Sequence, residues 1–174
     1  MDNGVPYLDR ITDFQKFLAP APQTPRSGMA GETIFNDIGC ADCHHPQFTT
    51  GVSAEPGLTG IDLKPYSDFL LHDMGALGDG IAQGDALEVE MKTPPLWGLR
   101  IRGQLLHDGR VLVQTLYQGV NDSVNWHFGE AFASSQAWNN LTKGEQDKVV
   151  AFLDSLGRAE YDTDGNNFID ESDL

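Results

Sequence analysis

The sequence predicts an all-α fold in which a few helices are joined by long loops. Two segments, 27–39 and 141–157, have the apolar periodicity of amphipathic helices. The residues between them are rich in Gly and Pro, which is typical of loops wrapped round a bound group. A chain of 174 residues is long enough for one such domain with a buried core.

The N-terminal 26 residues contain one short helical candidate, 11–18, followed by a proline-rich linker. We therefore expect a lead-in segment over 1–26, a main domain over 27–158 and an acidic tail over 159–174.

The first helix of the main domain is expected to open near Ser27, with Ile34, Phe35 and Ile38 on one side. Gly31 lies four residues before Phe35, on the same face, and its lack of a side chain permits another helix to approach closely.

The helix at 141–157 carries the clearest signals in the chain. Thr142 and Glu145 form a capping box, and Gly157 is a natural stop. Its apolar stripe consists of Val149, Phe152, Leu153 and Leu156. This stripe predicts core packing.

The net charge is -15, from 26 acidic and 11 basic residues. Such a chain would be repelled by nucleic acid phosphates, so nucleic acid is excluded as a partner. The charge suits electrostatic steering towards a basic protein partner, and it suits equally a solvated acidic surface with no particular partner. No apolar run approaches the length of a membrane span.

The stretch "GCADCHHPQF" contains the only two cysteines, Cys40 and Cys43, with His44 directly behind them. A C-x-x-C pair alone is compatible with half a zinc site, a redox pair or covalent haem attachment. No second cysteine pair exists to complete a zinc site, and the chain lacks the strand-to-helix pattern of a redox domain. The histidine after the second cysteine favours one c-type haem, with thioethers to Cys40 and Cys43 and His44 as the proximal iron ligand.

A helix leading into this motif and an amphipathic helix closing the domain are the arrangement seen in cytochromes c. The prediction is therefore an all-α, cytochrome c-like single-haem domain with long loops.

Several longer stretches then occur in a recognisable order: "GCADCHHPQFTTG", "YSDFLLHDMG", "KTPPLWGLR", "LLHDGR" and "HFGEAF…LTKGEQDKVVAFLDSL". Together they resemble the C-terminal half of the bacterial di-haem oxidoreductases, relatives of the di-haem cytochrome c peroxidases. The resemblance covers roughly residues 11–157, and it rests on five ordered motifs rather than on one.

Family members carry two haem motifs, whereas this sequence has one. In that superfamily the N-terminal haem is generally the peroxidatic one and the C-terminal haem passes electrons to it. The resemblance therefore implies an electron-transfer domain and does not imply enzyme activity. The alternative is a peroxidase-type haem enzyme acting on peroxide or a small substrate, in which Glu130 could serve as acid–base group if His127 did not bind the iron.

The distal iron ligand is first expected to be His127, which lies about one loop ahead of the last helix. The resemblance agrees, since "HFGEA" matches the position of a distal histidine, although the interval from His107 is longer than in relatives. Met74, in "LLHDMG", is the alternative, because a thioether is also a good haem ligand. His72 and His107 are expected to be hydrogen-bond partners rather than ligands, and Met91 a surface residue.

The segment "KTPPLWGLRIRG" is expected to pass along the haem edge. Arg100 and Arg102 would pair with propionates, and Trp97 would contact the ring or a propionate. Pro94 or Pro95 would offer a backbone carbonyl to the other nitrogen of His44.

The acidic tail has the oxygen-ligand spacing of an EF-hand calcium loop. Its predicted ligands are Asp162, Asp164, Asn166, Asp170 and Asp173, with the carbonyl of Phe168. Asn167 stands where Gly is usual, and Asp173 stands where Glu is usual, so a disordered acidic tail is the alternative.

The expected location is outside the cytoplasm, in a bacterial periplasm or another exported setting, because c-type haem is attached there. The expected partners are a redox protein, for which the charge favours a basic one, and a second haem domain or subunit.

Overall fold

The computed structural model describes residues 6–157, and it divides into two compact units. Of the described residues, 6–20 and 47–64 form the first unit, and 21–46 and 65–157 form the second. Residues 47–64, which lie within the predicted main domain, thus group with the N-terminal helix.

The first unit contains helix α1 (Tyr7–Lys16) and a two-stranded antiparallel sheet, β1 (Phe48–Thr49) with β2 (Asp62–Leu63). Its helix buries no residue, and Lys16 pairs with Glu55 at 3.4 Å. The predicted helix at 11–18 therefore exists, but it begins and ends earlier in the chain.

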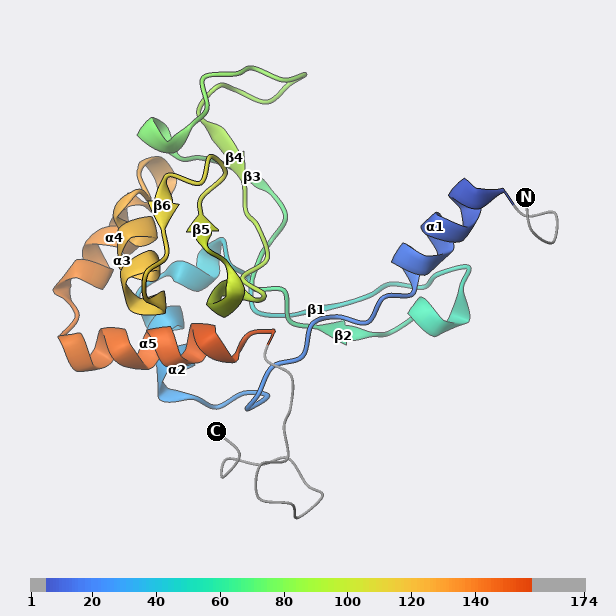
Figure 1. The fold of residues 1–174 in the computed structure, drawn as a ribbon, viewed down its shortest axis with the longest axis horizontal. Coiled ribbons are helices and arrows are strands. Elements are labelled where there is room, and N and C mark those ends of the chain that lie inside the picture. The colour runs from blue at the N-terminus through green and yellow to red at the C-terminus, as the bar shows by residue number, and fades with distance from the viewer. Residues whose placement is uncertain (1–5, 158–174) are drawn as a thin grey trace, which may run out of the picture. The chain divides into compact units, whose positions relative to one another are not determined.

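The second unit is built on four helices: α2 (Ala30–Asp37), α3 (Leu116–Asn125), α4 (Phe132–Asn140) and α5 (Lys143–Ser155). Helices α2 and α5 lie against each other (Figure 1). A Cβ at Gly31 would overlap the backbone carbonyl of Lys148, so glycine is what permits this contact. The close approach expected at Gly31 is present.

The capping box of α5 is also present. Thr142 accepts a hydrogen bond from the Glu145 amide, and the Glu145 carboxylate accepts from the Thr142 amide. Gly157 follows the helix with φ of 79°, in the left-handed region that glycine adopts readily. The residues of the predicted apolar stripe, Val149, Phe152, Leu153 and Leu156, are all buried.

The prediction of an all-α fold is wrong. The described residues also form three two-stranded antiparallel sheets, so the architecture is mixed α and β. Besides β1–β2, these are β3 (Leu71–Asp73) with β4 (Glu90–Lys92) and β5 (Gln104–Leu105) with β6 (Val111–Leu112). Loops that pack beside a core must satisfy their backbone N–H and C=O groups, and short ladders do so. Strands of two or three residues are too short to leave an alternating pattern in the sequence.

The core gathers Phe35 of α2, the buried Tyr66, Trp138 of α4 and the apolar stripe of α5. Three of its aromatic rings are in mutual contact: the Phe35 and Phe152 centroids lie 5.4 Å apart, and those of Tyr66 and Phe152 5.1 Å. This cluster also touches the ring of His44, whose centroid lies 6.3 Å from that of Phe35.

Gly31→Ala is expected to lower the free energy of unfolding by at least about 2 kcal/mol, because the new methyl group meets backbone that cannot yield. Gly144→Ala, in the first turn of α5 with open space around it, serves as the matched control. It is expected to raise stability by up to about 1 kcal/mol. Denaturant unfolding of both variants measures this, and equal effects would contradict the packing argument.

Candidate functional site

A cavity of about 390 Å³ opens in the second unit, within the size range of cofactor pockets. Apolar side chains make up most of its wall, among them Phe35, Leu77, Leu99, Leu105 and Leu153. The cavity is bounded by α2 on one side and by α3 and the segment after it on another.

The cysteine motif forms one wall of this cavity. Gly39 adopts φ of 81° and ends α2, and the chain then makes a short 3₁₀ turn over Cys40–Asp42. The amide of His44 donates to the carbonyl of Cys40 at 2.9 Å. This turn brings Cys40, Cys43 and His44 to the same cavity.

The orientation of His44 is set by a backbone carbonyl. Its Nδ1 lies 2.9 Å from the carbonyl oxygen of Tyr66, which can only accept, so Nδ1 carries the proton and Nε2 is left with a lone pair. The expected partner, the carbonyl of Pro94 or Pro95, is therefore wrong, although both prolines line the cavity. Tyr66 is fully buried with φ of 49°, and its hydroxyl donates to Glu32 at 2.8 Å.

His127 is held in the same way. It follows α3, and its Nδ1 donates to the carbonyl of Ser123 at 2.7 Å, which again leaves Nε2 with a lone pair. The rings of His44 and His127 face the same cavity with centroids 6.5 Å apart. A carbonyl on the second ring nitrogen is the usual support of a metal-bound histidine.

Both imidazoles are neutral in the folded protein. Burial lowers the pKa of His44 to about 4, an effect that the Tyr66 carbonyl only partly offsets. Burial likewise lowers the pKa of His127. The neutral ring is the form that binds metal ions.

The spacing of the two rings suits a single metal between them. A bond from a metal to an imidazole nitrogen is about 2 Å long, and the ring centre lies roughly 1 Å further, so two axial rings have centroids roughly 6 Å apart. The rings of His44 and His127 have this spacing.

His72 has a different environment. Its Nε2 lies 2.7 Å from the Asp68 carboxylate and its Nδ1 2.9 Å from that of Glu130, so both ring nitrogens are engaged. The hydrogen bond to Glu130 raises the pKa of His72, and this outweighs burial. The sequence predicts a hydrogen bond from His72 to a propionate or to the backbone, whereas the observed partners are two side-chain carboxylates. His72 also lines the cavity.

The remaining ligand candidates also line the cavity: Met74, Met91 and His107. Met74 stands at the end of β3, where its amide donates to the carbonyl of Val89. Met91 is half-buried, in contrast to the surface position expected from the sequence.

The fold places one of the three predicted haem-edge residues at the cavity and two outside its lining. Arg102 lines the cavity, and its guanidinium donates to the Trp97 carbonyl at 3.4 Å. Arg100 lies outside the cavity lining and pairs with Asp154 at 3.6 Å. Trp97 is half-buried against the core, and it too lies outside the cavity lining.

The predicted calcium ligands lie outside the described residues. They are Asp162, Asp164, Asn166, Phe168, Asp170 and Asp173.

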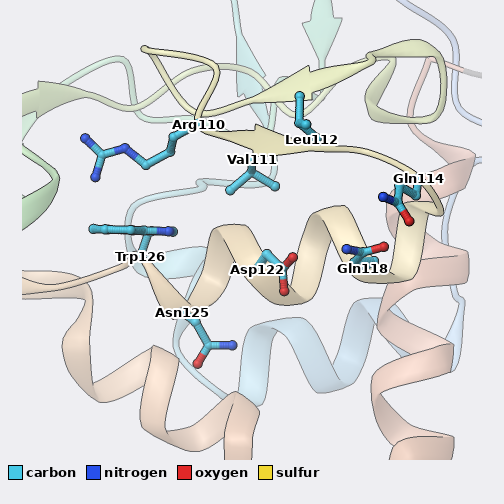
Figure 2. A pocket seen from close by; sticks show the side chains of 8 residues that line it. All are labelled: Arg110, Val111, Leu112, Gln114, Gln118, Asp122, Asn125 and Trp126. Atoms are coloured by element: carbon cyan, nitrogen blue, oxygen red, sulfur yellow. The ribbon is translucent and has the colours of Figure 1, made fainter.

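A second depression, of about 420 Å³, lies between β6 and α3 (Figure 2). Its polar side chains include Gln114, Gln118 and Asn125, and the Arg110 guanidinium lies 4.3 Å from the centre of the Trp126 ring. No cysteine or histidine lines it, so the haem chemistry indicated by the sequence belongs to the first cavity.

The sequence matches the family described as "di-haem oxidoreductase, putative peroxidase" over residues 18–156. The chain belongs to this family. Comparison with curated proteins and with solved structures finds no match. A di-haem oxidoreductase performs redox chemistry with haem, so haem is a cofactor of this chain and its function is of that class.

The residues of the cavity fit a haem. The cavity of this di-haem oxidoreductase is lined by two thiols, by two neutral imidazoles with an Nε2 lone pair each, and by a largely apolar wall. Within residues 6–157 there is no group of three or more His, Cys, Asp or Glu side chains that could hold a metal ion. The fit to a haem iron therefore depends on the histidine pair. Over the same residues, none of the helices has the length and apolar character needed to cross a membrane.

Sequence reasoning missed Tyr66, Asp68 and Ser123 as partners of the site. Tyr66 and Ser123 act through backbone carbonyls, which have no residue signature. The spacing of Asp68 and His72, four residues apart, suggests a helical pair, but the chain there is not helical: Phe69 has φ of 62°, and strand β3 begins at Leu71.

Tyr66→Phe is expected to lower the free energy of unfolding by about 2 kcal/mol, because the buried hydroxyl no longer donates to the Glu32 carboxylate. The carbonyl of residue 66 remains, so the spectrum of the bound haem is expected to stay as in the parent protein. Denaturant unfolding and optical spectra measure the two effects. A changed haem spectrum with unchanged stability would contradict this reading of Tyr66.

Proposed function

We propose that this chain is an electron-transfer domain with one c-type haem attached to Cys40 and Cys43. Its iron would be held between His44 and His127 and would cycle between the ferric and ferrous states. The observation that supports this most strongly is the 6.5 Å separation of the two imidazole centroids across the cavity. When bound, the haem supplies the electron-accepting and electron-donating centre.

The protein's own contribution is to pre-organise both axial positions. Carbonyls of Tyr66 and Ser123 orient the rings, and burial keeps them neutral and ready to bind. An iron with two fixed axial ligands has no open position for substrate, and little in the site must rearrange when an electron arrives. Both properties favour electron transfer over catalysis.

A peroxidase-type reaction is the second candidate, because Glu130 and His72 line the same cavity and could move protons there. Against it, the Glu130 carboxylate already accepts from both His72 and the Asp73 amide. Such a reaction would also require His127 to leave the iron.

Partners and location follow from the proposed cofactor and the charge. With a net charge of -15, the domain suits a basic redox protein partner. A second haem domain or subunit is a further partner, since the family is di-haem and this sequence has one C-x-x-C-H motif. Covalent haem attachment implies an exported, periplasmic setting.

Calcium is proposed as a second cofactor on the sequence of the acidic tail alone. The spacing of its carboxylate and amide side chains is that of an EF-hand loop.

The axial assignment is tested by the optical and EPR spectra of the ferric and dithionite-reduced haem protein. His127→Ala is expected to convert low-spin to high-spin ferric iron and to let the ferrous form bind carbon monoxide. Met74→Leu is the matched control, since it keeps an apolar side chain in the cavity wall, and is expected to leave the spectrum unchanged.

A weak band at the red end of the ferric spectrum that is lost in Met74→Leu and kept in His127→Ala would identify Met74 as the distal iron ligand instead. High-spin ferric iron in the parent protein, reacting with peroxide, would overturn the electron-transfer proposal in favour of the second candidate.

Calcium binding is tested by isothermal titration of the full chain with calcium chloride. Paired substitution of Asp162→Ala and Asp164→Ala is expected to weaken binding at least about tenfold, because two charged oxygen ligands are removed. Asp79→Ala and Asp85→Ala, two aspartates outside the tail, form the matched control. Equal affinity of the parent and the tail variant would refute the calcium proposal.

A further inference from the structure

His72 is the one cavity-lining histidine described here whose two ring nitrogens both lie against carboxylates. Carboxylate oxygens accept hydrogen bonds, so both nitrogens donate, and the ring is best matched as an imidazolium between two negative groups. Neither nitrogen is directed to the iron position proposed above. The question is what this arrangement connects.

On one side it connects to the segment that carries the cysteine motif. Residues 66–68 lie along residues 43–45: the Ser67 amide donates to the His45 carbonyl at 3.0 Å, and the Asp68 amide to the Cys43 carbonyl at 2.9 Å. The Tyr66 carbonyl accepts from His44 within the same alignment. The Asp68 carboxylate then holds Nε2 of His72 at 2.7 Å.

On the other side it connects to the segment that carries His127. Nδ1 of His72 lies 2.9 Å from one oxygen of Glu130, and the Asp73 amide donates to the other at 3.1 Å. Glu130 stands three residues after His127, in the short turn Gly129–Ala131. Gly129, with φ of 54°, lies so close to the Asp73 carbonyl that a Cβ would overlap it.

We propose that His72 is a positioning residue that fixes the distance between the two axial histidines. The series Asp68, His72 and Glu130, which we call the carboxylate–imidazole bridge, ties the proximal segment to the distal segment at the cavity wall. This inference rests on the proposed function, because it assumes that His44 and His127 are the two ligands.

The bridge suits this role for a physical reason. His127 is attached to α3 on its N-terminal side, where Ser123 holds its ring, but the chain after it is a loop and a short 3₁₀ turn. Charge-assisted hydrogen bonds are short and directional, so a doubly bonded imidazolium restrains that turn better than apolar contact would. Groups that orient metal ligands typically alter metal binding by about 10- to 100-fold when removed.

The experiment compares the rates at which carbon monoxide binds to the ferrous haem protein in the parent and five variants. One of these, His127→Ala, removes the proposed distal ligand itself. His72→Phe keeps the ring size and removes both hydrogen bonds. Glu130→Ala removes the distal end of the bridge, and Glu130→Gln keeps one oxygen as acceptor. Glu88→Ala, at an exposed glutamate outside the cavity lining and outside the bridge, is the matched control for Glu130→Ala.

We expect carbon monoxide to bind about tenfold faster in His72→Phe and Glu130→Ala, because the distal ligand leaves more readily when its segment is loosened. The rate in Glu130→Gln is expected to fall between those of these variants and the parent, and the rate in Glu88→Ala to match the parent. EPR of the ferric proteins should show broadened or shifted low-spin signals in the same order. Thermal unfolding, measured in parallel, separates this effect from loss of stability.

Rates in His72→Phe and Glu130→Ala equal to that of Glu88→Ala would overturn the positioning role, provided that His127→Ala raises the rate. If His127→Ala leaves the rate unchanged, the axial assignment fails, and the positioning role fails with it. If His72→Phe does not yield folded haem protein, the positioning role is decided by the order of the binding rates in Glu130→Ala, Glu130→Gln and the parent.

Discussion

The site depends on two imidazole rings that are kept neutral and turned towards each other across one cavity. Each ring donates its Nδ1 hydrogen to a backbone carbonyl, of Tyr66 for His44 and of Ser123 for His127, and each keeps a lone pair on Nε2. Burial makes the charged form of either ring costly. Both rings are therefore in the protonation state that the proposed iron coordination requires.

The packing of α2 on α5 supports the proximal half of this arrangement. Gly31 allows the helices to touch at backbone distance, and the contact places Phe35 beside Phe152 and Tyr66. The same aromatic cluster reaches the His44 ring and buries the Tyr66 backbone whose carbonyl holds it. The hydrophobic core and the support of the His44 ring are thus continuous, so a change in helix packing should alter the position of that ring.

The distal half is organised differently, by loops rather than by long helices. Short ladders such as β3–β4 satisfy the backbone groups of segments that border the cavity. Glu130 and His72 then connect those segments to the region that follows α3. The cavity therefore has one side built on packed helices and one side held chiefly by hydrogen bonds.

The sequence by itself determined the local features: the cysteine motif with His44, the family, the capped helix α5 and the glycine contact at Gly31. These follow from residue type and spacing within one segment. Residues 159–174 carry a calcium motif that stays a prediction.

Only the tertiary structure decided that Tyr66 rather than Pro94 or Pro95 faces His44, that His127 lies opposite it, and that His72 joins two carboxylates. It also showed the short strands that the all-α prediction lacked. Backbone carbonyls and two-residue ladders leave no mark on side-chain pattern, and long-range pairs form only when the chain has folded.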